Sequence, residues 1–227
     1  MPLPGDLNED GVVDLLDLMI VSAAYDTSEG DPDFDPRADC NGDGTVNLMD
    51  LIFVARHFGD GSSSKMMAMS KLSSLTEVES NTVVRVAASD YTPAAGEEID
   101  VAIEIVDSPG IGGFQFDLLY DPNHLEPITT TEGSFLSGGN GEYQTFNLPL
   151  DLQAQGTVGP IVCTRLSRDA ASGMGTLFNI RFKVLQDSPN EIEISNLKLV
   201  DSMPVEVDAV SEGAVINGTW VDDWKSY

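Results

Sequence analysis

The feature that most constrains this chain is a twelve-residue pattern that occurs twice, 33 residues apart. In residues 6–17 and again in residues 39–50, oxygen-bearing side chains occupy loop positions 1, 3, 5, 9 and 12, and glycine occupies position 6. Calcium-binding loops have this spacing, because alternate side chains of a tight loop converge on one ion. Two matches in the same register argue against a chance acidic turn, so the sequence predicts two bound calcium ions.

The spacing also predicts which residues bind each ion. Position 7 would contribute its backbone carbonyl, and position 9 would bind directly or through water. Gly11 and Gly44 would allow a backbone reversal that a residue with a Cβ resists. The expected ligands are Asp6, Asn8, Asp10, Val12, Asp14 and Asp17 in the first loop, and Asp39, Asn41, Asp43, Thr45, Asn47 and Asp50 in the second.

Each loop is expected to lead into a helix, at about residues 15–25 and 48–58, but no helix is expected before it. Only five residues precede the first loop, and Pro32 and Pro36 oppose a helix before the second. A duplicated loop with an exiting helix resembles the dockerin family, and the resemblance covers about residues 5–60. We therefore predict a first module that spans residues 1–60. The resemblance implies a small all-α calcium-binding unit that docks onto a cohesin.

The two expected helices are apolar on more than one side. Leu18, Val21 and Tyr25 form one stripe, with a matching stripe on the second helix, and these should make a small shared core. A unit of this size has too little interior to bury a second apolar face. We therefore expect a partner-docking face, although the helices could instead pack broadly on each other. The face comprises Leu15, Leu16, Met19, Ile20, Leu48, Met49, Ile52 and Phe53.

The dockerin resemblance gives loop positions 10 and 11 the main influence on partner choice. Those positions hold Leu15 with Leu16 and Leu48 with Met49, where many dockerins carry hydroxyl pairs. The resemblance thus implies an apolar interface.

A second module begins near residue 81, after a stretch (residues 61–80) expected to be a linker with one short amphipathic helix as an alternative. From there the hydrophobic period is two, which predicts strands and a β-sandwich or jelly roll. Residues 218–227 form a tail. The expected strands are Thr82–Ala88, Glu98–Val106, Gly113–Tyr120, Val158–Leu166, Gly175–Val184, Glu191–Val200 and Val205–Ile216.

Residues 110–126 and 175–184 resemble strands of the cohesin family, and the resemblance extends over about residues 81–217. It implies a nine-stranded jelly-roll sandwich whose flat outer sheet face receives a dockerin. Matched on Tyr120-Asp121-Pro122, the resemblance puts Gly113, Gln115, Asp117 and Leu119 on that face.

Composition limits the partners and the location. The net charge of −27 argues against nucleic acid and anionic membranes. No run of 18 apolar residues occurs, and no signal peptide is recognised at the start of the chain. Calcium loops of this kind suit the millimolar calcium outside cells, so an extracellular or cell-surface location is expected.

Cys40 and Cys163 are expected to be free thiols rather than a disulfide.

Together these features predict a non-catalytic, calcium-dependent assembly adaptor in a cellulosome-like system. Its partners would be cohesin-bearing and dockerin-bearing proteins, with head-to-tail pairing between copies as a further option. His57 and His124 lie in no recognisable catalytic motif. One alternative is a carbohydrate-binding sandwich for polysaccharide degradation, although Tyr143, Trp220 and Trp224 are scattered aromatic candidates. The other is a pair of modules packed permanently together, which would bury the apolar helix faces within one chain.

Overall fold

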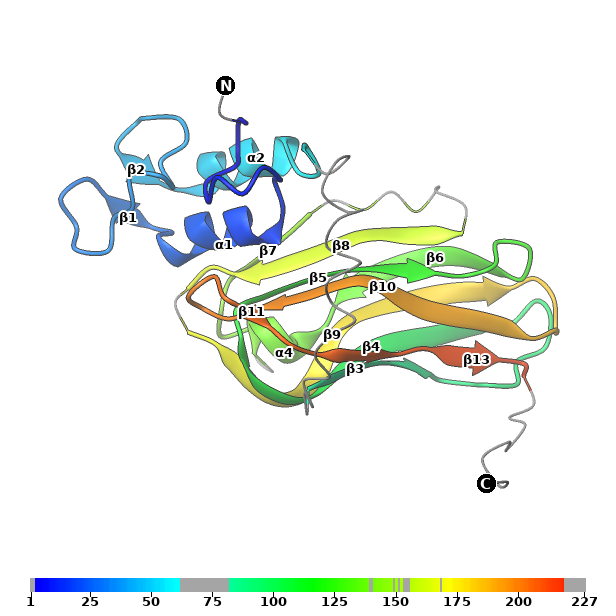
Figure 1. Ribbon diagram of the computed structural model, residues 1–227. Coiled ribbons are helices and arrows are strands. Elements are labelled where there is room, and N and C mark those ends of the chain that lie inside the picture. The colour runs from blue at the N-terminus through cyan, green and yellow to red at the C-terminus, as the bar shows by residue number, and fades with distance from the viewer. Residues whose placement is uncertain are drawn as a thin grey trace, which may run out of the picture.

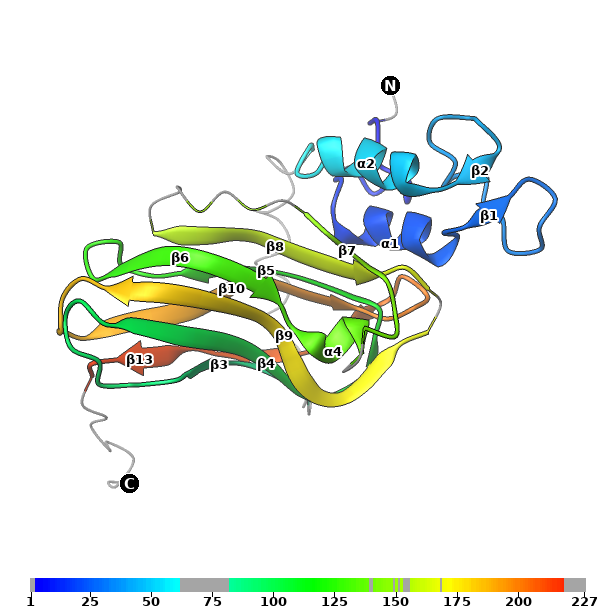
Figure 2. The same cartoon turned by 180° about the vertical axis from the view of Figure 1, so that it is seen from behind.

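The computed structural model shows a small helical module lying against a β-sandwich (Figures 1 and 2). It describes residues 3–61, 82–138, 141–148, 150, 152, 156–167 and 169–218. Nearly all of the expected linker, with the short helix that was its alternative, lies outside these residues. Trp220, Trp224 and nearly all of the tail do so too. The helical module lies against one end of the sandwich (Figure 1).

Two nine-residue helices form the N-terminal module, α1 (Leu15–Ala23) and α2 (Leu48–Arg56). Each begins with a capping box that satisfies free N–H groups of the first turn. Asp14 caps α1 and Asn47 caps α2, and the aspartate three residues later in each case accepts the N–H of the cap residue. Two short strands, β1 (Thr27–Ser28) and β2 (Thr45–Val46), pair antiparallel beside the helices. This strand pair was not expected.

The helices share a fully buried core, to which Leu18, Val21, Leu51 and Val54 all contribute. A backbone bridge also closes the module. The Val13 N–H donates to the Asp60 carbonyl at 3.0 Å, and the Gly59 N–H donates to the Val13 carbonyl at 2.8 Å. The first loop is therefore tied to the segment that follows α2.

The sandwich consists of two sheets that enclose a core rich in phenylalanine, isoleucine and valine. The described strands of the first sheet are, in order, β11 (Glu206–Val207), β10 (Asn190–Val200), β5 (Gly113–Leu119), β8 (Thr157–Arg165) and β7 (Thr145–Asn147), and β13 (Ala214–Ile216) also pairs with β10. Those of the second are β12 (Val210–Glu212), β3 (Val83–Ala88), β4 (Glu98–Ile111), β9 (Ala171–Val184) and β6 (Leu125–Glu132). A one-turn helix, α4 (Ser134–Ser137), follows β6.

The alternation expected in β5 is present. Phe114, Phe116 and Leu118 are buried in the core between the sheets. The intervening residues therefore lie on the outer face of the sheet, since successive side chains of a strand point to opposite faces. That outer face is where the helical module sits.

The observed strands differ from the expected ones in several places, and β7 is one strand that was not expected. Residues 205–216 were expected to be one strand but form β11, β12 and β13, because the chain crosses between sheets: β12 pairs with β3 and β13 with β10. β6 was not expected, since Pro127 and a run of threonines obscure its pattern. It is tolerated at the edge of the sheet, where a register shift follows Pro127.

Candidate docking interface and calcium loops

The first loop folds around its own backbone N–H groups. Asp6 accepts from the N–H groups of Asp10 (3.0 Å) and Gly11 (2.9 Å), and Asn8 accepts from Asp10 at 2.9 Å. The Asp10 carboxylate in turn accepts from Val12 at 2.9 Å. Gly11 has φ of 91°, in the left-handed region that glycine adopts readily. The oxygens of positions 1, 3 and 5 are thus turned toward the inside of one tight loop.

The second loop repeats this arrangement. Asp39 accepts from the N–H groups at positions 4, 5 and 6, Asn41 accepts from that of Asp43, and Asp43 from that of Thr45. Gly44 has φ of 84°, which matches Gly11. Hydrogen bonds from the Thr45 side chain and neighbouring groups lower the pKa of Asp43, so it is a carboxylate at neutral pH.

The aspartates at position 12, Asp17 and Asp50, are completely buried. Asp17 accepts the N–H groups of Leu7 (2.7 Å), Asn8 (3.2 Å) and Asp14 (2.8 Å). Burial nevertheless raises its pKa to about 6, and the nearby Asp14 charge adds to the increase. A divalent cation in the loop would oppose this effect by favouring the ionised carboxylate.

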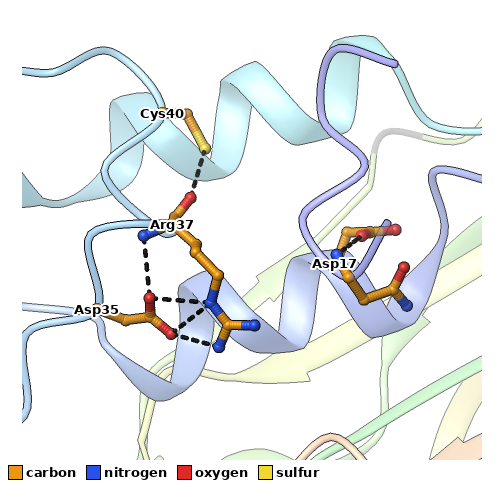
Figure 3. A network of polar contacts seen from close by, with 5 residues as sticks. Asp17, Asp35, Arg37 and Cys40 are labelled. Atoms are coloured by element: carbon orange, nitrogen blue, oxygen red, sulfur yellow. Dashed lines mark hydrogen bonds and ion pairs between the residues drawn. The ribbon is translucent and has the colours of Figure 1, made fainter. Parts of the chain in front are cut away.

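The segment that leads into the second loop carries an ion pair at the surface. Arg37 donates to both oxygens of Asp35, with Nη2 2.7 Å from Oδ2 (Figure 3). This hydrogen bonding lowers the pKa of Asp35. The Cys40 thiol lies 3.9 Å from the Arg37 carbonyl, and both Cys40 and Cys163 are free, as expected (Figure 3).

The donor chemistry of both loops suits a hard cation. Within the part of the chain that the structure describes, no three His, Cys, Asp or Glu side chains gather at one point as the loops stand. All predicted side-chain ligands are nevertheless carboxylate or amide oxygens, the ligands that calcium prefers. Each loop also includes one fully buried carboxylate, whose charge a bound cation would offset.

Helix α1 lies on the outer face of the first sheet, over β5, β8 and β10. Leu15 is completely buried and Met19 is 1% exposed. The Thr164 hydroxyl of β8 lies 2.8 Å from the Met19 sulfur. Val162 and Val200 join the apolar cluster of the helical module from the sheet side. One apolar core thus continues from the helices into the sandwich surface.

Two glycines make the space that α1 fills. A Cβ added to Gly113 would lie 2.7 Å from the Met19 sulfur and 3.2 Å from Leu15 Cδ1. A Cβ added to Gly112 would lie 2.7 Å from the Met19 methyl carbon. The two separations of 2.7 Å are shorter than the contacts that real Cβ atoms make, so the Met19 side chain occupies a depression left by the absence of side chains at both positions.

An ion pair also crosses the interface. The Lys198 ammonium, on β10, lies 2.5 Å from Asp14 Oδ2, and the Asp14 side chain is 8% exposed. The other Asp14 oxygen accepts the Leu16 N–H at 2.8 Å. Both oxygens of this predicted calcium ligand therefore have partners, and Asp14 connects the first loop directly to the sheet. Glu206 lies 3.9 Å from the same ammonium.

A cavity of about 420 Å³ remains beside this pair, between the loop and the sheet. Gln115 and Asp117 of β5 line it from the sandwich side, and Phe58 and Val12 line it from the helical side. Asn196 donates to Asp117 at 2.5 Å. Gln115 Oε1 is buried and accepts no hydrogen bond from the described residues.

The structure separates the predicted helix face into two halves. Leu15, Met19 and Ile20 of α1 are buried, and Leu16 is partly exposed. On α2, Leu48 and Met49 are 47% and 58% exposed. Ile52 and Phe53 are half-buried, and the Phe53 ring packs on His57.

On the sandwich side, Gly113 lies under α1, Gln115 and Asp117 line the cavity, and Leu119 lies at the far end of β5, paired with Thr157. Sequence reasoning missed Gly112, Thr164 and Lys198. Only the position of Gly112 next to Gly113 offered a signal in the sequence.

Family comparisons identify both modules. Residues 83–219, more than half of the chain, match the cohesin domain family. The chain belongs to the cohesin family. Residues 4–59 match the dockerin type I domain family, so a dockerin module precedes the cohesin module. A comparison with curated protein sequences found no significant match.

Solved cohesin structures share the sandwich fold. A type II cohesin domain from the cellulosome of Acetivibrio cellulolyticus is 22% identical, with a TM-score of 0.50 over 60% of this chain and 95% of its own. The second type II cohesin of an adaptor scaffoldin from the same organism is 14% identical, with a TM-score of 0.51 over 63% and 99%. A chain from a type II cohesin–X–dockerin complex of that organism is 14% identical, with a TM-score of 0.50 over 60% and 99%.

These findings confirm the predicted family, the sandwich fold and the class of function. Cohesins and dockerins are assembly modules, so the chain is an adaptor for cohesin-bearing and dockerin-bearing partners. The carbohydrate-binding alternative is not favoured, and Tyr143 stacks on the Arg165 guanidinium at 3.9 Å rather than extending freely. Dockerin type I domains bind calcium, and cellulosomal modules act outside the cell. Every described helix is too short or too polar to cross a bilayer.

Proposed function

We propose that the two modules of this adaptor recognise each other, closing within one chain and joining copies head to tail when chains exchange their dockerins. The observation that supports the proposal is the seating of α1 on the cohesin sheet. Leu15 and Met19 are buried over Gly112 and Gly113, and a charge pair lies at the edge of this contact. The contact combines an apolar centre with a polar rim, as specific protein interfaces do.

In this proposal the calcium ions are structural, and the chain has no catalytic role of its own. Two ions would be held by the predicted ligands, with Asp14 serving chiefly as the contact to Lys198. Because α1 and α2 each follow directly from a loop, ion binding would fix the direction in which each helix leaves it. Residues 1–60 carry 14 acidic against 2 basic residues, so bound cations would also relieve repulsion. Millimolar extracellular calcium suits such sites.

Covalent connection favours closure over assembly at low concentration. A short connection gives two modules an effective mutual concentration on the order of millimolar. Free dockerins or cohesins at lower concentration would therefore compete poorly with the module on the same chain. At high protein concentration, exchange of dockerins between chains would produce closed rings or open chains without any new type of contact.

Light scattering on the full chain tests this proposal. With millimolar calcium, the mass should be that of a monomer at low micromolar concentration and should rise as the concentration increases. A chelator should abolish the rise, and the Asp6→Ala/Asp39→Ala variant should behave in calcium as the wild type does in chelator. A measured mass that changes with neither calcium nor protein concentration would count against exchange between copies. Unchanged amide exchange in β5, β8 and β10 on calcium removal would count against closure as well.

A further inference from the structure

The dockerin module has two nearly equivalent ends, because the cross-repeat contacts occur twice. The Gly59 N–H donates to the Val13 carbonyl at 2.8 Å, and the Asp26 N–H donates to the Val46 carbonyl at 2.9 Å. Asp26 is the repeat equivalent of Gly59, and Val46 is that of Val13, because the two repeats are offset by 33 residues. Both helices are nine residues long and begin with the same capping box. A half-turn of the module therefore exchanges α1 with α2.

The apolar residues give little basis for choosing between these two orientations. The half-turn would replace Leu15 by Leu48, Leu16 by Met49, Met19 by Ile52 and Ile20 by Phe53. All four replacements remain apolar, so either helix could cover the valines and glycines of the sheet. In this structure α1 occupies the sheet, and Leu48 and Met49 are exposed. Something other than the apolar contact must select α1.

The charge at the helix cap differs between the two ends. Asp14 caps α1 and pairs with Lys198, whereas the matching position before α2 is the neutral Asn47. Asn47 Oδ1 already accepts the Met49 N–H at 2.8 Å, and its amide nitrogen donates to the Thr45 hydroxyl at 2.9 Å. The half-turn would leave Lys198 opposite a neutral side chain. In this structure its other carboxylate partner among the described residues is Glu206, at 3.9 Å.

We propose that Lys198 is the residue that sets orientation, by selecting the helix whose cap carries a carboxylate. This inference rests on the proposed docking between the modules. Losing one partner of a largely buried charge pair disfavours the wrong arrangement, which is how charged groups commonly fix register at interfaces. The cohesin sheet would accordingly prefer dockerins with Asp, rather than Asn, at the cap of the docking helix. In this chain the preference leaves the α2 end facing solvent.

Methionine oxidation of the full chain in calcium can report the orientation. Met19 is 1% exposed and Met49 58%, while Met174 and Met203, both 74% exposed, are internal references on the cohesin module. Exposed methionines oxidise readily and buried ones resist. Peroxide followed by peptide mass spectrometry should show Met19 reacting roughly tenfold more slowly than the references, with Met49 close to them.

The decisive variant exchanges the caps, Asp14→Asn with Asn47→Asp. Each loop then carries a residue that the other loop already accommodates at that position. The exchange should move Met19 to the half-buried position that Ile52 now holds and Met49 to the half-buried position that Leu16 now holds. Met19 should therefore react faster than in the wild type, and Met49 more slowly. Lys198→Met, which leaves both loops untouched, should give intermediate oxidation at both sites because neither orientation is preferred.

An exchange variant that keeps the wild-type pattern would overturn the role of Lys198. So would an exchange variant with both methionines fully reactive, because the pair would then be needed for docking but would not choose between helices. A wild type in which Met19 reacts as fast as Met174 would instead refute the docking itself.

Discussion

Replacing Met19 by alanine is the most direct test of the docking interface. Met19 fills the depression over Gly112 and Gly113 and contacts Thr164. Truncating a buried methionine to alanine costs about 2–5 kcal/mol, through lost burial and the cavity that remains. Because the site lies between modules that can partly readjust, we take about 2–4 kcal/mol. That loss corresponds to a Kd weakened by about 30- to 700-fold, at 1.4 kcal/mol per factor of ten.

Isothermal titration of a residue 1–61 fragment against a residue 82–227 fragment, in millimolar calcium, measures this change. Ile52→Ala is the matched control, because Ile52 holds the same position on α2 and is only half-buried. We expect the control to change the Kd by less than about threefold. Calcium-dependent melting of each helical fragment checks that its loops still fold.

The reasoning fails if Ile52→Ala weakens binding as much as Met19→Ala, since α1 would then not be the docking helix. It also fails if neither variant weakens binding. A Met19→Ala fragment that no longer responds to calcium would be misfolded, and Thr164→Val on the sheet would then test the same contact from the other side.

Three further predictions concern other parts of the chain. Calcium should raise the melting temperature of the dockerin module by mass action, and Asp6→Ala with Asp39→Ala should abolish the rise in differential scanning calorimetry; a double variant that still responds would disprove the ligand assignment. Gly113→Val should fill the depression and weaken docking by about 1–3 kcal/mol in the same titration, whereas undiminished affinity would show that α1 does not approach this strand. Cys163 is completely buried, so iodoacetamide should modify it in native protein far more slowly than in denaturant; equal rates would contradict its place in the sandwich core.

The sequence predicted those elements in which a single requirement sets the pattern: the spacing of the loop residues for the two helix starts, and alternating burial for β5. Both helices begin at the expected residues because the capping aspartate and asparagine are also loop positions, so one spacing defines two features. In β5, alternating phenylalanines identified the core face correctly. The prediction of one strand over residues 205–216 was wrong because a segment that crosses from one sheet to the other keeps its alternation of apolar and polar residues while it changes its partner strand. β6 was hidden because an edge strand can contain a proline and many polar residues.

The docking contact was less accessible to sequence reasoning. The apolar face on two helices was visible, but the repeat makes the two helices look alike. Their difference depends on Lys198, a single residue on a distant strand with no local signal. The depression over Gly112 and Gly113 likewise depends on the absence of side chains. Glycines do not contribute to a hydrophobic pattern, so the pattern does not reveal the depression. Such features become visible only when both surfaces are in place.

The bridge between Val13 and the segment after α2 has a consequence for engineering. It brings the two ends of the dockerin module together, and Gly61 lies so close to Leu3 that an added Cβ would be 3.0 Å from the leucine side chain. A unit whose entry and exit are adjacent can be inserted into a surface loop of an unrelated host without stretching either protein. The module could thus serve as a connector placed in the middle of a chain, and not merely at its end.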